Sequence, residues 1–303
     1  MQHDHATTRL KIIVGIATAG RREVLADVID HLSRQTRLPD ALLICPASPA
    51  DVEEARLVQF PSPYQIIGGG RGLCAQRNAI LDTSADGDII VFFDDDFLPA
   101  NNFLAETERL FREQPKIVVA TGKVIADGIH GPGIGVMHAL TMLAEDEQST
   151  APRGNGFPVY NAYGCNMVLR LAAIRKDHAR FDEMLPLYGW QEDVDFCRRL
   201  APYGEIVNDP MLRGIHLGAK RGRISGVRFG YSQIANPLYL VGKGTVSKRW
   251  ALNLMARNCA ANILGSLRKP GMVDRRGRLR GNLMALWDAA RRKMSPQRIL
   301  TLE

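Results

Sequence analysis

Apolar and polar residues follow one another along the first two-thirds of the chain in the pattern of alternating strands and helices. Short apolar runs rich in β-branched residues predict strands at residues 10–17, 41–45, 64–67, 88–93, 117–124 and 167–169. Apolar residues at helical spacing predict helices at residues 21–34, 73–81, 102–113, 137–144 and 194–200. This alternation predicts an α/β fold with a mostly parallel central sheet and helices on both faces.

The last part of the chain has a different pattern and a different charge. Beyond residue 244, apolar and basic residues interleave and predict two helices broken at Pro270-Gly271. We therefore divide the chain into an α/β domain, residues 1–244, and a basic helical extension, residues 245–303; this boundary is a prediction. Residues 213–303 hold 19 Lys and Arg against 3 Asp and Glu, whereas the preceding residues hold 20 against 29. An acidic body with a basic tail indicates that the tail faces something anionic.

Composition excludes several classes of protein. The chain has 303 residues, a net charge of +7, 46% apolar residues and 23% charged residues, so it is neither disordered nor fibrous. Five scattered cysteines without a C-x-x-C pair argue against a zinc ribbon or a disulfide framework and fit a reducing compartment. The first residues lack the apolar core of a signal peptide, and no apolar run reaches the length of a membrane span. These features predict a cytoplasmic location.

Three adjacent carboxylates, Asp94, Asp95 and Asp96, end the apolar run at residues 88–93. They repel one another, and folding does not require them. Ligands of open α/β sheets bind at the carboxyl ends of the strands. Mg²⁺ or Mn²⁺, held by carboxylates and substrate phosphates, would explain the cluster. The alternative is a solvated acidic turn in which Asp96 caps the next helix.

A second acidic cluster, Glu192, Asp193 and Asp195, follows about a hundred residues later. Capping of a helix N-terminus would account for it, because the helix dipole favours acidic residues there. A carboxylate at this place could also act as a general base on an acceptor hydroxyl. His216 lies in a short apolar stretch, where a histidine is more often a packed side chain, although imidazole is a common metal ligand.

Several segments match the motifs of one enzyme family. They are residues 16–21 for I-P-T-x-N-R, residues 72–78 for G-x-x-x-A-R-N, residues 93–96 for D-x-D, residues 181–183 with 192–195 for F-D-E and E-D-x-x-L, and residues 236–243 for R-N-x-x-Y-L-x-x-K. With these motifs the chain resembles family 2 glycosyltransferases of the GT-A fold, over roughly four-fifths of its length. The D-x-D and E-D segments are the most specific part of the resemblance.

The sequence also departs from the family pattern. Ala17 and Gly20 replace the opening Pro and Asn. Residues 45–48 read C-P-A-S, where the family has a D-D-G-S-like run whose carboxylate contacts the nucleotide base, so the donor base stays open. The Q-x-x-R-W motif of processive synthases is absent after the E-D segment, and we expect a non-processive enzyme.

The resemblance implies an inverting, metal-dependent glycosyltransferase. It would move a sugar from a nucleoside-diphosphate sugar to an acceptor hydroxyl, with Mg²⁺ or Mn²⁺ as the cofactor. The resemblance implies that Asp193 and Glu192 act in catalysis. It implies that the nucleotide sugar is bound by Thr18, Arg21, Arg77, Asp94 and Asp95. It implies that the metal is bound by Asp94, Asp96 and His216.

The basic extension predicts contact with an anionic membrane surface, on the inner face of the membrane. Such contact would present a saccharide acceptor, in particular a lipid-linked saccharide, for surface polysaccharide synthesis. Packing of the apolar residues on the catalytic domain is an equal alternative, and nucleic acid is not expected because the acidic body would repel its phosphates. A sugar-phosphate nucleotidyltransferase and a non-enzymatic anionic-surface-binding protein are the alternative functions; the second leaves both acidic clusters unexplained.

Overall fold

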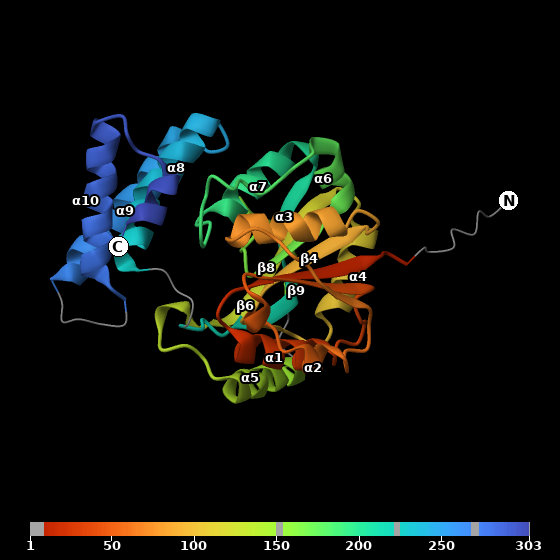
Figure 1. Ribbon diagram of the computed structural model, residues 1–303. Helices are drawn as coiled ribbons and strands as arrows, with labels where there is room; N and C mark the ends of the chain where they lie inside the picture. The colour runs from red at the N-terminus through yellow and green to blue at the C-terminus, as the bar shows by residue number, and fades with distance from the viewer. Residues whose placement is uncertain (1–8, 150–153, 221–224, 268–272, 303) are drawn as a thin grey trace.

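The structure is a computed structural model of the chain (Figure 1). It describes residues 9–149, 154–220, 225–267 and 273–302. The strands are β1 (Ile12–Thr18), β2 (Ala41–Pro46), β3 (Tyr64–Ile66), β4 (Ile89–Asp94), β5 (Phe97–Pro99), β6 (Ile117–Asp127), β7 (Phe157–Pro158), β8 (Asn166–Arg170) and β9 (Glu205–His216). The helices are α1 (Arg22–Leu32), α2 (Glu54–Leu57), α3 (Leu73–Thr83), α4 (Phe103–Glu113), α5 (Val136–Gln148), α6 (Leu171–Asp177), α7 (Glu192–Leu200), α8 (Gly226–Lys243), α9 (Lys248–Ser266) and α10 (Arg275–Ala290). Short 3₁₀ helices lie at Pro49–Asp51, Gly128–His130, Ala201–Tyr203 and Pro296–Thr301.

The strands form one mixed sheet in the order β3-β2-β1-β4-β8-β6-β9-β5, and β7 pairs with β9 off this path. β3, β2, β1 and β4 run parallel to one another, and so do β6 and β9. β8, β5 and β7 run antiparallel to their neighbours. The predicted parallel arrangement is confirmed for the first half of the sheet. In the second half, β8 matches the strand predicted at residues 167–169 but runs antiparallel, and β5 and β7 were not predicted.

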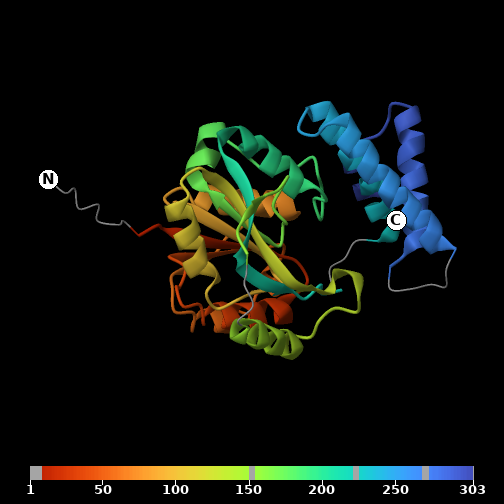
Figure 2. The same ribbon diagram turned by 180° about the vertical axis from the view of Figure 1, so that it is seen from behind.

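Helices cover both faces of the sheet, as the α/β prediction requires. Along β1, Ile12, Val14 and Ile16 point to one core and Ile13 to the other, because successive side chains of a strand alternate between faces. The first core lies under α1, α4 and α5, and the second under α3, α6 and α7 (Figures 1 and 2). The predicted α/β fold class is confirmed.

Helices α8, α9 and α10 form a separate layer beside the sheet domain (Figures 1 and 2). Tyr231 of α8, Met255 of α9 and Ala285 of α10 share one small core. The two helices predicted beyond residue 244 are confirmed, and the predicted break at Pro270-Gly271 lies outside the described residues. α8 precedes residue 244 and packs with both later helices; the division of the chain at residue 244 stays a prediction. None of the helices in the described ranges is long and apolar enough to cross a membrane.

Several contacts, both polar and aromatic, tie this helical layer to the sheet domain. Lys243, the last residue of α8, has its ammonium group 2.6 Å from a carboxylate oxygen of Asp182 and 2.6 Å from one of Asp195. Trp250, near the start of α9, stacks on Tyr160 with ring centroids 5.8 Å apart. The helical layer therefore contacts the sheet domain close to the second acidic cluster.

Candidate active site

The first acidic cluster forms the turn between β4 and β5. Asp94 ends β4 and lies opposite Ala17 of β1, so it stands at the carboxyl edge of the parallel strands. Asp96 is buried, and its Oδ2 accepts a hydrogen bond of 2.7 Å from the backbone nitrogen of Ala219. Because the cluster is largely buried, the alternative of a solvated acidic turn is wrong.

Asp95, the middle carboxylate, is buried and fully hydrogen-bonded. Thr18 Oγ1 and Arg21 Nη1 each donate to it at 2.7 Å. Burial raises the pKa of Asp95 to about 6, against the opposing effect of Arg21 and Thr18. The structure thus brings Thr18 and Arg21 to the acidic turn, as the motifs suggested. Their contact with a donor nucleotide stays a prediction.

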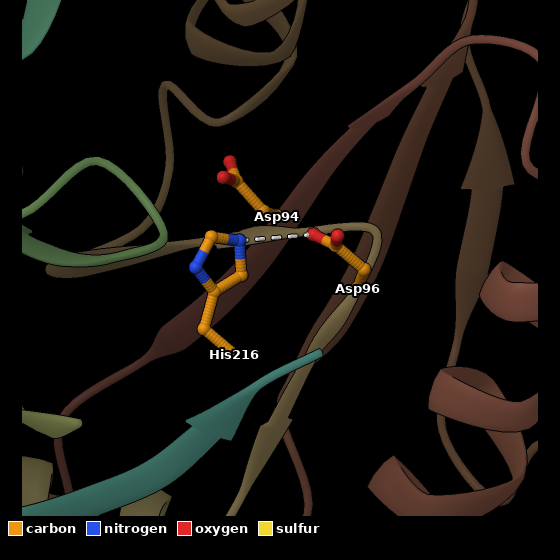
Figure 3. A group of neighbouring side chains, drawn as sticks. All are labelled: Asp94, Asp96 and His216. Atoms are coloured by element: carbon orange, nitrogen blue, oxygen red, sulfur yellow. Dashed lines mark ion pairs between the residues drawn. The ribbon is translucent and has the colours of Figure 1, made fainter. Parts of the chain in front are cut away.

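Asp96 and His216 point toward each other, and the carboxylate of Asp94 lies on the same side of the turn, near the imidazole (Figure 3). One oxygen or nitrogen ligand atom from each lies within 4.8 Å of the others. Phe97 of β5 pairs with His216, the last residue of β9, and this pairing carries the imidazole to the acidic turn. Asp96 Oδ1 is buried and lies 3.3 Å from His216 Nε2, with which it forms an ion pair while the imidazole is protonated; it makes no hydrogen bond to another described residue. A cation bound here would take the place of that proton.

A second carboxylate orients the imidazole of His216. Its Nδ1 lies 3.0 Å from Asp127 Oδ1, and Tyr163 donates a hydrogen bond of 3.0 Å to Asp127 Oδ2. Burial opposes the charged imidazole, but Asp127 and Asp96 outweigh it and raise the pKa of His216 to about 10. Asp127 thereby directs Nε2 toward the acidic turn, which is how carboxylates orient metal-binding histidines.

Arg77, on α3, joins the two acidic clusters. Its side chain is buried, with 1% of the residue exposed. Nη2 donates to Asp94 Oδ1 at 3.1 Å and to the carbonyl of Gly164 at 2.8 Å, while Nη1 donates to Glu192. Both arms of the guanidinium are therefore engaged inside the protein. Contact of Arg77 with a nucleotide sugar stays a prediction.

Glu192 and Asp193 begin helix α7 and differ in their surroundings. Glu192 is buried against Arg77, whereas Asp193 is partly exposed and lines a cavity of about 550 Å³. The backbone nitrogen of Val194 donates to Asp193 Oδ1 at 2.8 Å. Burial raises the pKa of both carboxyls. A raised pKa makes Asp193 a better proton acceptor for a group bound in the cavity.

The sequence from residue 13 to residue 176 matches the family described as Glycosyl transferase family 2. This match covers more than half of the chain. The chain belongs to glycosyl transferase family 2. The predicted resemblance is confirmed, and the nucleotidyltransferase and non-enzymatic alternatives are set aside. The match contains the first acidic cluster and Arg77, while Asp193 and His216 lie beyond it.

Solved structures resemble this glycosyltransferase at low sequence identity. The mannosyltransferase PcManGT from Pyrobaculum calidifontis, in complex with GDP-Man and Mn²⁺, is 15% identical, with a TM-score of 0.57 over 97% of this chain and 86% of that one. TarS 1-349 from S. aureus, in complex with UDP-GlcNAc, is 14% identical, with a TM-score of 0.55 over 96% and 83%. GalNAc-T7 with UDP, GalNAc and Mn²⁺ is 12% identical, with a TM-score of 0.56 over 76% and 51%. The chain spans 40% of the longer TarS structure. These likenesses show the GT-A fold. A separate comparison with curated protein sequences found no match.

The side chains of Asp94, Asp96 and His216 suit a divalent cation. Two carboxylates provide the hard oxygen ligands that Mg²⁺ and Mn²⁺ prefer, and imidazole is a ligand for transition metals. The convergence of one ligand atom from each of the three residues, all within 4.8 Å of one another, is the observation that favours such a site. A cation bound there would stabilise negative charge on the phosphates of a donor.

The structure also identifies supporting residues that sequence analysis missed. Asp127 and Tyr163 hold His216. The sequence gives no signal for Asp127, because the strand predicted at residues 117–124 ends before it. Asp195 is buried and pairs with Lys243, so it serves the packing of α7 on α8 and is no substitute for Asp193 as the base.

Proposed function

We propose that this glycosyltransferase transfers a sugar from a nucleoside-diphosphate sugar to an acceptor hydroxyl by a single inverting displacement. The main support is that Arg77 joins Asp94 of the acidic turn to Glu192, the neighbour of Asp193. The donor phosphates would lie at the turn, and the acceptor would lie in the cavity beside Asp193. This places the two substrates on opposite sides of one buried arginine.

Asp193 acts as the general base in this proposal. It takes the proton of the acceptor hydroxyl while the hydroxyl oxygen bonds to the anomeric carbon of the sugar. The bond between that carbon and the diphosphate breaks, and the nucleoside diphosphate leaves with the bonding electrons. Attack from the face opposite the leaving group inverts the anomeric configuration. Glu192 does not reach the acceptor, because Arg77 occupies its carboxylate.

Asp94, Asp96 and His216 would hold the cation, and Thr18, Arg21 and Asp95 support that turn from the side of β1. The complexes of PcManGT and GalNAc-T7 with Mn²⁺ support a metal, and the ligand set suits both Mg²⁺ and Mn²⁺. The complexes with GDP-Man and UDP-GlcNAc support a nucleotide sugar as the donor.

The acceptor is proposed to be a saccharide linked to a lipid, used in the synthesis of a surface polysaccharide by a non-processive enzyme. The support comes from α9 and α10, where large apolar side chains are exposed among arginines and lysines. These apolar side chains are Leu252, Ile263, Leu264, Leu283 and Trp287, with 48–63% of each exposed. Apolar and basic groups so combined suit a peripheral contact with an anionic membrane surface.

A panel of nucleoside-diphosphate sugars tests the proposal. The full chain is incubated with each donor in Mn²⁺, in Mg²⁺ and in EDTA, and release of the nucleoside diphosphate is measured. We expect release from at least one donor, dependent on the cation and increased by saccharide acceptors. Release that is equal in EDTA, or that is absent with every donor, would contradict the proposal.

A further inference from the structure

The cavity beside Asp193 lies between β6, β7 and β9. Its volume of about 550 Å³ is within the range of ~300–1,000 Å³ typical of small-molecule sites. Of the described residues that line it, two carry charged side chains, Asp193 and Lys123. The cavity therefore offers one cationic and one anionic group to whatever it binds.

A β-bulge places Lys123 in this wall. In the pairing of β6 with β9, Gly122 lies opposite Asp209 but Lys123 lies opposite Arg213, so three residues of β9 loop out. The loop approaches β6 so closely that a Cβ on Gly122 would lie 1.9 Å from the carbonyl oxygen of Leu212. Bulges next to functional sites redirect the neighbouring side chain, and here that side chain is Lys123.

Lys123 is exposed, and within the described ranges no carboxylate lies within ion-pair distance of its ammonium group. Most surface lysines contribute little to stability, so a bulge that directs one into a cavity needs another explanation. An ammonium group without a protein partner can pair with a phosphate or carboxylate of a ligand.

Other residues of the lining suit a sugar ring. Phe157 of β7 is 54% exposed and pairs across the strands with Asn208 of β9. Asn161 and Tyr163 complete the polar lining. An aromatic ring beside amide groups matches a saccharide, which has apolar C–H faces and hydroxyl edges.

We propose that this cavity binds an anionic saccharide acceptor, whose phosphate or carboxylate pairs with Lys123 while a hydroxyl faces Asp193. This inference rests on the proposed glycosyltransfer and names the chemical class of its acceptor. Lys123 is then the residue that selects charged acceptors over neutral ones.

Binding of three small probes to the full chain tests the inference without a donor or a divalent cation. The probes are glucose 1-phosphate, glucuronic acid and methyl glucoside, and their affinities are measured by NMR titration in EDTA. We expect an anionic probe to bind more tightly than methyl glucoside. The Lys123→Ala variant should bind that anionic probe about tenfold more weakly, with little change for methyl glucoside. Lys123→Arg should keep most of the affinity.

Lys116→Ala is the matched control, because Lys116 is an exposed lysine before the other end of β6; its affinities should equal those of the wild type. Tighter binding of glucose 1-phosphate alone identifies a phosphate-bearing acceptor, and tighter binding of glucuronic acid alone identifies a carboxylate. Equal affinity of all three probes, or an unchanged anionic affinity in Lys123→Ala, would overturn the inference. Since no donor is present, this result is independent of the nucleotide-sugar panel that tests the proposed function.

Discussion

The two acidic clusters of this glycosyltransferase arrange their charge in opposite ways. In the turn after β4 the carboxylates lie together: Asp95 is fully hydrogen-bonded, and one oxygen of each of its two neighbours lies within 4.8 Å of a ring nitrogen of His216. At the start of α7 they are separated, because Glu192 and Asp195 each bind a cationic side chain and only Asp193 lines the cavity. Gathered carboxylates suit a cation, whereas a single accessible carboxylate suits proton transfer.

Asp96→Asn should have the largest effect, because it changes the acidic cluster in the turn after β4. The amide keeps an oxygen for the backbone nitrogen of Ala219 but removes the charge that a cation needs. We expect cation-dependent donor binding, and with it transfer, to fall below detection, measured by calorimetry with the nucleotide sugar in Mn²⁺.

Asp96→Asn should also lower the free energy of unfolding, because it removes the buried partner of His216 and Arg21. Donor binding is therefore measured at a temperature where circular dichroism shows the variant to be folded. Donor affinity in Mn²⁺ equal to that of the wild type would end the metal role of Asp96.

Asp193→Asn tests the acidic cluster at the start of α7. The amide keeps the volume of the side chain but cannot accept the proton, so kcat should fall by about 10²–10⁴-fold. Donor affinity should change little. The measurement is steady-state transfer alongside calorimetric binding of the donor.

Asp195→Asn is the matched control for Asp193→Asn, two residues further along α7. It weakens the contact with Lys243 and should lower the melting temperature, while the folded protein keeps its kcat. If Asp195→Asn lost turnover and Asp193→Asn kept it, the assignment of the base would be reversed.

Arg77→Met should destabilise the fold, because it leaves Glu192 buried without its partner. Removing one member of a buried ion pair costs about 3–5 kcal/mol, measurable by denaturant unfolding. Arg112→Met, at an exposed arginine on α4, should change stability by less than about 0.5 kcal/mol. Equal stability of the two variants would show that Arg77 does not join the clusters.

Asp127→Asn should have a smaller effect than Asp96→Asn, because Asp127 contacts His216 and lies outside the group Asp94, Asp96 and His216. Loss of a carboxylate that orients a metal-binding histidine typically weakens metal affinity about 10–100-fold. Titration with Mn²⁺ measures this affinity. No change would show that the orientation of the imidazole does not depend on Asp127.

The smallest effect is expected for the helical layer. The double variant Leu283→Ser/Trp287→Ser should reduce co-sedimentation with phosphatidylglycerol vesicles at low salt, because each side chain exposes apolar surface on α10. Met137→Ser, at an exposed methionine of α5, is the control on the sheet domain. If the wild-type chain does not co-sediment with these vesicles, the membrane proposal is wrong.

Substitutions are preferable to truncation at residue 244, because truncation would expose the buried Tyr231 of α8.

The sequence predicted the first half of the sheet because β1, β2 and β4 are uninterrupted apolar runs. β9 could not be predicted, because Asp209 and Pro210 interrupt its apolar pattern and the bulge opposite Gly122 shifts its register. The approach of His216 to the acidic turn depends on the pairing of β9 with β5, which no local pattern reveals.

The motifs located both acidic clusters, but the separate tasks of their members needed the fold. Asp193 and Asp195 are two residues apart on a helix and therefore project in nearly opposite directions, one into the cavity and the other toward Lys243. Arg77 was expected beside a nucleotide because its motif resembles the family pattern. Its burial between Asp94 and Glu192 depends on α3, β4 and α7 together.

The position of Arg77 also bears on how this enzyme can change over generations. A single guanidinium spans Asp94 and Glu192, so the spacing between the two acidic clusters is set by one planar side chain. Lysine has the charge but not the fork, and it could satisfy only one of the two carboxylates well. Substitutions at Asp94, Arg77 and Glu192 are therefore not independent: drift at one position changes which residues are acceptable at the other two, although they lie far apart in the sequence.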